Sequence, residues 1–118
     1  MTSTLVQRTQ RAESRTDLTD LSPDDLLDLL GDEYTRKVLR AVTEQPRSSA
    51  AIADATSTSK PTAYRRLDRL EAAGLVTSRT VLDPNGHHHK EFESVLEEAT
   101  LRLEDGELDL VLEATTPA

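Results

Sequence analysis

The sequence predicts an α+β domain in which three to four helices are followed by two β-hairpins. Between residues 22 and 74, apolar side chains recur at helical spacing, and capping or breaking residues separate the segments. From residue 75 onward, apolar and polar residues alternate, as they do in strands. Two turn sequences, Asp83-Pro-Asn-Gly86 and Asp105-Gly106, interrupt this alternation. A helical half therefore precedes a half made of hairpins.

Length and composition restrict the classes of protein open to this chain. Its 118 residues suffice for one domain with a modest core. Cysteine is absent, which excludes disulfides and thiolate metal sites. No apolar run is long enough to span a membrane, and the N-terminus lacks the apolar block of a signal peptide. We expect a cytoplasmic protein with no membrane partner, and its three aromatic residues are too few for a base-stacking platform.

The first helix has a strong start signal. Ser22 is placed as the N-cap, Pro23 takes the first helical position, and Asp25 completes a capping box. Gly31 breaks the helix. Its leucines offer more apolar surface than one small domain needs, which favours a dimer; they are Leu26, Leu27, Leu29 and Leu30.

A second helix is predicted over residues 33–45, with Asp32 as its cap and Pro46 as its end. The residues expected to face inward are Tyr34, Val38, Leu39 and Val42.

A short helix and a longer one follow, with a polar break at residues 56–59 between them. Ser49 is expected to cap the short helix over residues 49–55, and Ser59 or Lys60 to cap the longer one. Gly74 ends the longer helix. Ala63, Leu67 and Leu70 form its buried stripe, because they recur at i, i+4 and i+7. A short helix, a tight turn and a helix with a basic surface together make a helix-turn-helix.

The segment from Ile52 to Val76 resembles the winged helix-turn-helix repressors of the ArsR-like class, and its Gly-Leu-Val ending is the most specific part. The stretch Leu-Leu-Gly-Asp-Glu-Tyr-Thr-Arg-Lys-Val-Leu at residues 29–39 resembles the opening of such domains, where it helps to build the dimer. The resemblance implies a DNA-binding domain over residues 21–95, with the hairpin after Gly74 as a wing on the DNA backbone or minor groove. Thr56-Ser57 stand where such families have a turn glycine.

A solvated, ion-paired face is the ordinary explanation for a charged helix, but the helix-turn-helix context favours contact with double-stranded DNA. Arg65 or Arg66 is suited to reading guanine, and Thr62 to contacting phosphate or a thymine methyl. The residues that we expect at the DNA are Ser59, Lys60, Thr62, Tyr64, Arg65, Arg66, Arg69, Arg79, His87, His88, His89 and Lys90.

Charge is segregated along the chain. The net charge is −8, yet residues 36–79 hold nine basic and four acidic residues, and the remainder holds five basic and 18 acidic. Abundant acid and little lysine resemble proteins of salt-loving archaea. At about 1 M salt the Debye length is only ~3 Å, so a distant acidic surface repels DNA weakly.

The three consecutive histidines at the wing tip invite a metal interpretation. Successive strand side chains point to opposite faces, so only His87 and His89 share a side. No cysteine or further histidine completes a tetrahedral site. We therefore expect no metal or other cofactor, and either backbone contact or a plain polar tip. Nucleophile and phosphate-loop patterns are also missing, so we expect no enzymatic activity.

The two ends of the chain are less tightly specified. Residues 1–20 are expected to be a mobile tail, with a DNA-touching arm or a dimer helix as alternatives. Residues 96–113 are predicted to form a hairpin, in which Leu103 pairs with Leu108 and Leu101 with Leu110. This hairpin serves either as core cover or as a second dimer surface, and a C-terminal dimer helix is the competing interpretation. Residues 114–118 are a tail.

These observations predict a homodimeric, double-stranded DNA-binding transcription regulator. An acidic winged-helix module that docks on a partner protein is the alternative, and RNA binding is a third option.

Overall fold

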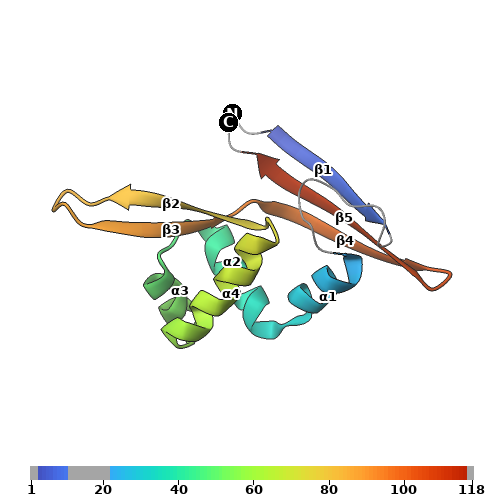
Figure 1. Cartoon of the computed structure of the whole chain (residues 1–118), viewed down its shortest axis with the longest axis horizontal. Helices are drawn as coiled ribbons and strands as arrows, with labels where there is room; N and C mark the ends of the chain where they lie inside the picture. The colour runs from blue at the N-terminus through green and yellow to red at the C-terminus, as the bar shows by residue number, and fades with distance from the viewer. Residues whose placement is uncertain (1–2, 11–21, 117–118) are drawn as a thin grey trace.

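The computed structural model describes residues 3–10 and 22–116 (Figure 1). The elements in chain order are β1 (Ser3–Gln10), α1 (Pro23–Gly31), α2 (Glu33–Glu44), α3 (Ser49–Thr56), α4 (Lys60–Ala72), β2 (Val76–Leu82), β3 (His88–Ser94), β4 (Leu96–Glu104) and β5 (Glu107–Thr116). The helices, a two-stranded wing and a second antiparallel sheet make an α+β winged helix-turn-helix fold, which confirms the predicted fold class.

The helices begin at the predicted caps, with one exception. The Ser22 hydroxyl accepts from the Asp25 amide at 3.2 Å, and the Ser59 hydroxyl accepts from the Thr62 amide at 3.3 Å. The short helix α3 is capped by Ser48 rather than Ser49, since the Ser48 hydroxyl accepts from the Ala51 amide at 3.2 Å. The two adjacent serines at residues 48 and 49 are both candidate caps, and sequence alone does not separate them.

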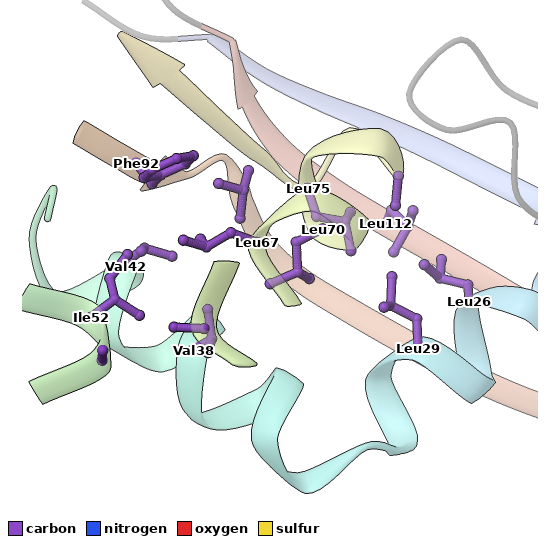
Figure 2. Packing of buried hydrophobic residues seen from close by; sticks show 14 of the residues in the cluster. Leu26, Leu29, Val38, Val42, Ile52, Leu67, Leu70, Leu75, Phe92 and Leu112 are labelled. Atoms are coloured by element: carbon purple, nitrogen blue, oxygen red, sulfur yellow. The ribbon is translucent and has the colours of Figure 1, made fainter. Parts of the chain in front are cut away.

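One hydrophobic core connects the helices with both sheets (Figure 2). The predicted α4 stripe lies inside it, with Ala63, Leu67 and Leu70 all fully buried. The inward placement of Tyr34 is wrong: its side chain is 44% exposed, and the Lys37 ammonium lies 5.4 Å from its ring centroid. Thr35 is buried instead.

The wing is the two-stranded sheet of β2 and β3. An isolated bridge joins it to the loop between α2 and α3, where the Arg47 amide donates to the Phe92 carbonyl at 3.0 Å and the Phe92 amide donates back at 2.7 Å. Phe92 itself is buried in the core. The base of the wing is therefore fixed to the helical part of the molecule.

The C-terminal hairpin forms in the predicted register, with Leu103 opposite Leu108 and Leu101 opposite Leu110, so the alternative of a C-terminal helix is wrong. Asp105 and Gly106 make the turn, both with positive φ. Strand β5 continues to Thr116, into the segment expected to be a tail.

The leucines of α1 pack against the buried face of β5. Leu110, Leu112 and Ala114 are buried on β5, and Figure 2 places Leu112 beside Leu26 and Leu29 of α1. The hairpin thus covers the core, one of its two expected roles. It also uses within the chain most of the α1 leucine surface that favoured a dimer.

The expectation of a tail over residues 1–20 is wrong for residues 3–10. These residues form β1, which pairs antiparallel with β5 and gives the sheet order β1-β5-β4. Residues 1–2 and 11–20 lie outside the described part of the chain, so the alternatives for them stay untested.

Candidate nucleic-acid interface

The turn between α3 and α4 is built from hydroxyl groups rather than glycine. The buried Thr56 hydroxyl contacts the Ile52 carbonyl at 2.7 Å and the Thr58 hydroxyl at 2.9 Å. Ser57 adopts the left-handed conformation with φ 56°, which non-glycine residues rarely do. The Thr58 amide then donates to the Ala53 carbonyl at 3.0 Å. These contacts set the direction in which α4 leaves the turn.

The two faces of α4 differ sharply. Its buried face carries Ala63, Leu67 and Leu70, whereas Lys60 and Arg65 on the other side are exposed. Among the described residues, neither Lys60 nor Arg65 has a carboxylate within ion-pair distance. A guanidinium without a protein partner keeps all of its donors for a ligand.

Arg66 lies on the same helix but has a different environment. Its Nε donates to Asp32 Oδ2 at 2.8 Å, and its side chain is only 19% exposed. The same Asp32 oxygen accepts from the Thr35 amide at 2.9 Å and from the Thr35 hydroxyl at 2.7 Å. Arg66 therefore joins α4 to the start of α2.

The pKa of Asp32 is lowered from its ordinary value of 3.8. Hydrogen bonds from the Thr35 hydroxyl and the Thr35 amide are the largest causes, because both stabilise the carboxylate. Burial opposes them, and the positive charge of Arg66 adds to the lowering. Asp32 is thus an ionised acceptor shared by two helices.

Arg69 lies on the side of α4 that faces α1. It lines a hollow of about 450 Å³ together with Asp25 and Asp28 of α1 and with Ala72 and Ala73. Within the described residues it has no carboxylate at ion-pair distance, yet its surroundings are acidic. Within the described residues, Arg65 is therefore the arginine of α4 that neither has an ion-pair partner nor lines this acidic hollow.

Tyr64 brings the side of α4 next to the wing. Its ring meets that of Phe92 edge to face, with centroids 6.5 Å apart and an interplanar angle of 78°. The two rings line an open groove of about 490 Å³ with the start of α3 and the base of the wing; the other lining residues are Ser48, Ser49, Ala50, His89 and Lys90. The fold thus places three predicted contact residues, Tyr64, His89 and Lys90, around one groove.

The wing carries its own acidic residue between its cations. Glu91 lies 3.7 Å from Arg79 across the hairpin and 3.4 Å from His89 on the same strand. Arg79 is still 69% exposed. His87 and His88 are exposed at the tip, next to the turn in which the Asn85 amide donates to Asp83 Oδ1 at 2.8 Å.

Two further arginines in the basic stretch are structural. Arg36 donates to the carbonyls of Leu30 and Gly31 at the end of α1, at 3.0 and 2.8 Å. Arg47 donates from Nε to the Ala41 carbonyl at 2.8 Å. Part of the positive charge in residues 36–79 therefore closes helix ends, and composition alone could not show this.

Sequence reasoning missed the Asp32–Arg66 pair and the role of Glu91. The first joins residues 34 positions apart, for which no local pattern exists. The second had a usable signal, because Glu91 falls opposite Arg79 once the hairpin register is drawn.

Residues 30–79 match a family model described as a helix-turn-helix domain. The match begins at the end of α1 and runs through α2, α3, α4 and the first half of β2. No curated protein matches the chain.

The molecule thus contains a helix-turn-helix domain followed by a wing, a class of domain associated with DNA binding. Between residues 22 and 116, none of the helices has the length and apolar character required to cross a membrane. The described residues also contain no group of three or more potential metal ligands.

Proposed function

We propose that this protein is a transcription regulator that binds specific sequences of double-stranded DNA as a dimer. The observation that carries the proposal is the exposed face of α4, where Lys60 and Arg65 have no ion-pair partner among the described residues. A second helix of a helix-turn-helix enters the major groove with its N-terminal residues at the base edges.

In this proposal, Arg65 reads guanine through two parallel hydrogen bonds. Thr62 and Ser59 lie beside it at the start of α4, with their hydroxyls 2.9 Å apart, and contact the phosphate backbone. Tyr64 faces the groove at the base of the wing. Arg66 mainly positions α4 against the start of α2, because its guanidinium is held by Asp32.

The wing contributes contacts that do not depend on sequence. Its cationic and polar side chains are exposed, and they are Arg79, His87, His88, His89 and Lys90. Contacts to phosphate fix register and orientation without reading bases. Arg69, beside the acidic side chains of α1, belongs to the edge of this surface.

The acidity of the chain bears on the conditions under which it binds. With a net charge of −8, the protein as a whole repels DNA at low salt. We propose that it is adapted to high salt, where the Debye length of ~3 Å at about 1 M confines repulsion to direct neighbours. Short-range contacts of α4 then carry the affinity. In this proposal the protein has no enzymatic activity, and it works in the cytoplasm together with the DNA that it binds.

Selection from a pool of random duplexes at molar salt tests the proposal. The expected result is enrichment of one sequence motif, and a two-fold repeat within it if a dimer binds. The matched control is Arg65→Ala, which keeps the buried face of α4 and should enrich that motif poorly. A pool that stays random after selection with the folded wild-type protein would contradict DNA reading.

Docking on a partner protein is the second candidate, because Leu101 and Leu103 are 49% and 71% exposed on the C-terminal hairpin. The same selection separates the two, since a docking module enriches no duplex.

A further inference from the structure

Strand β4 is an edge of the three-stranded sheet. The sheet order is β1-β5-β4, and β4 runs for nine residues from Leu96 to Glu104. Apart from Leu96, all of its residues are exposed. Among the described residues, no strand pairs with its outer side. An exposed edge of this length is a template for pairing with another chain.

The hairpin turn fixes which backbone groups of β4 face outward. Asp105 and Gly106 both have positive φ, as in a two-residue turn, and Glu104 pairs with Glu107. In such a turn the flanking pair is hydrogen-bonded, and bonded and non-bonded pairs then alternate along the ladder. Arg102 and Thr100 therefore bond toward β5. The N–H and C=O groups of Ala99, Leu101 and Leu103 point to the open edge.

We infer that β4 pairs antiparallel with β4 of a second copy of this chain, on a two-fold axis that passes beside Thr100. In this register Ala99 lies opposite Leu101 of the second copy, so outward-pointing backbone groups meet each other on both sides of the axis. The inference rests on the proposed function only in assuming that the protein binds DNA as a two-fold symmetric dimer. Its physical basis is the row of outward-pointing backbone groups on β4.

Side-chain charge selects this register over its neighbour. With Thr100 on the axis, Glu98 of each copy faces Arg102 of the other, which adds two attractive cross-strand pairs to the Arg102–Glu104 ion pair within each strand. With Leu101 on the axis, Glu98 would face Glu104, and like charges directly opposite are destabilising. The sequence of β4 is therefore self-complementary about Thr100, as an isologous interface requires.

Pairing also covers exposed apolar surface. Ala99 and Leu101 lie on the same face of the sheet as Leu112 and Leu110, their partners on β5. Leu101 is 49% exposed in the single chain. In the pair it packs beside Ala99 of the second copy. Figure 1 shows the tip of the β4–β5 hairpin and the wing at opposite ends of the molecule, so pairing leaves the wing uncovered.

Cysteine cross-linking in the absence of DNA tests the pairing. The chain has no cysteine, so Thr100→Cys introduces a single thiol at the axis. Residues facing each other in a non-bonded antiparallel pair have Cα atoms about 4.5 Å apart, which is within the range for a disulfide. We expect Thr100→Cys to give a covalent dimer on mild oxidation.

Two matched controls accompany this variant. Thr80→Cys places a thiol on exposed edge strand β2 of the wing, outside the proposed interface, and should stay monomeric. Leu101→Cys should cross-link poorly, because in the proposed register the two copies of this residue are offset by two positions, about 7 Å along the strand. Equal cross-linking of Thr100→Cys and Thr80→Cys would overturn the inference. Preferential linkage through Leu101→Cys would overturn the register.

Charge exchange supplies a second, non-covalent test. Glu98→Arg alone and Arg102→Glu alone each replace two attractive pairs by two repulsive ones, and each should raise the dimer dissociation constant about tenfold in low salt. The double variant Glu98→Arg/Arg102→Glu should restore it. Analytical ultracentrifugation measures this constant, and circular dichroism confirms that each variant is folded. A double variant as weak as the singles would contradict the pairing, whatever the DNA selection shows.

Discussion

A single oxygen of Asp32 accepts three hydrogen bonds, from the Thr35 amide, the Thr35 hydroxyl and Arg66 Nε. It caps α2 and holds α4 with the same charge. Because the Arg66 side chain is mostly buried, its loss leaves Asp32 with one fewer partner in a half-buried site.

We expect Arg66→Ala to lower the free energy of unfolding by about 1–2 kcal/mol. Arg65→Ala, one position earlier and exposed, should change it by less than about 0.5 kcal/mol. Urea unfolding of both variants measures the difference. Equal stabilities would show that the Asp32–Arg66 pair does not hold α4.

The lowered pKa of Asp32 predicts a pH dependence. A carboxyl with a lower pKa in the folded state contributes stability above its unfolded pKa, and this contribution is lost as pH falls through the folded value. We expect Asp32→Asn to be less stable than wild type at neutral pH, with the gap narrowing as pH falls below 3.8. Urea unfolding at a series of pH values tests this. A gap that stays constant across the series would contradict it.

Sequence reasoning at the residue scale worked where a pattern is local. The caps at Ser22, Asp32 and Ser59 and the buried stripe of α4 were predictable, because each depends on residues within one or two turns. The sequence predicts DNA contact for both Arg65 and Arg66, and no spacing rule distinguishes their roles. The difference between them comes from the tertiary contact of Arg66 with Asp32.

At the scale of elements, the turn of the C-terminal hairpin depends on Gly106. Its φ of +77° is in the left-handed region, although an added Cβ would meet no atom within 4 Å. We expect Gly106→Ala to destabilise the protein by about 1 kcal/mol through backbone strain alone.

Gly31→Ala is the matched control. An added Cβ there also meets nothing within 4 Å, and this glycine ends α1 without a positive φ. This variant should keep or slightly raise the thermal unfolding temperature. If both glycine variants unfold at the same temperature, backbone strain at residue 106 does not explain why the turn needs glycine.

The wing supplies a prediction about its acidic residue. Glu91 lies near both Arg79 and His89. Glu91→Gln therefore removes the carboxylate that both side chains contact, and with it one negative charge of the wing. We expect tighter DNA binding and a steeper salt dependence, because the side chains no longer held by Glu91 can contact phosphate. The change should be the same on all duplexes, because phosphate contacts carry no base information. Glu93→Gln, exposed on the same strand, removes an equal charge and should have a smaller effect. Salt titrations of binding compare the two, and a change confined to one sequence would contradict the proposed role.

The elements show the same division between local and distant signals. The helices and both hairpins follow from periodicity, caps and turn residues, and they formed near their predicted bounds. Strand β1 was missed because it is defined by pairing with β5, some hundred residues away, and has no start or turn signal of its own. The leucines of α1 were read as a dimer surface for the same reason, since their partner strand lies at the other end of the chain.

At the scale of the whole molecule, the fold separates the end that carries the wing from a sheet that covers the core. The wing extends from one end and the C-terminal hairpin from the other (Figure 1). Lys60 and Arg65 of α4 have no ion-pair partner in the part of the chain that the structure describes, while most other arginines of the basic stretch are held by protein groups. We therefore propose that DNA sequence is read by α4, chiefly by Arg65.

The measurement that tests this claim most directly compares Arg65→Ala with Arg79→Ala on two duplexes at molar salt, one selected by the wild-type protein and one random. We predict that Arg65→Ala loses about 1–3 kcal/mol on the selected duplex and little on the random one. Arg79→Ala should weaken both duplexes about equally. If Arg65→Ala binds both duplexes as the wild-type protein does, α4 does not read sequence through this residue, and the central claim is wrong.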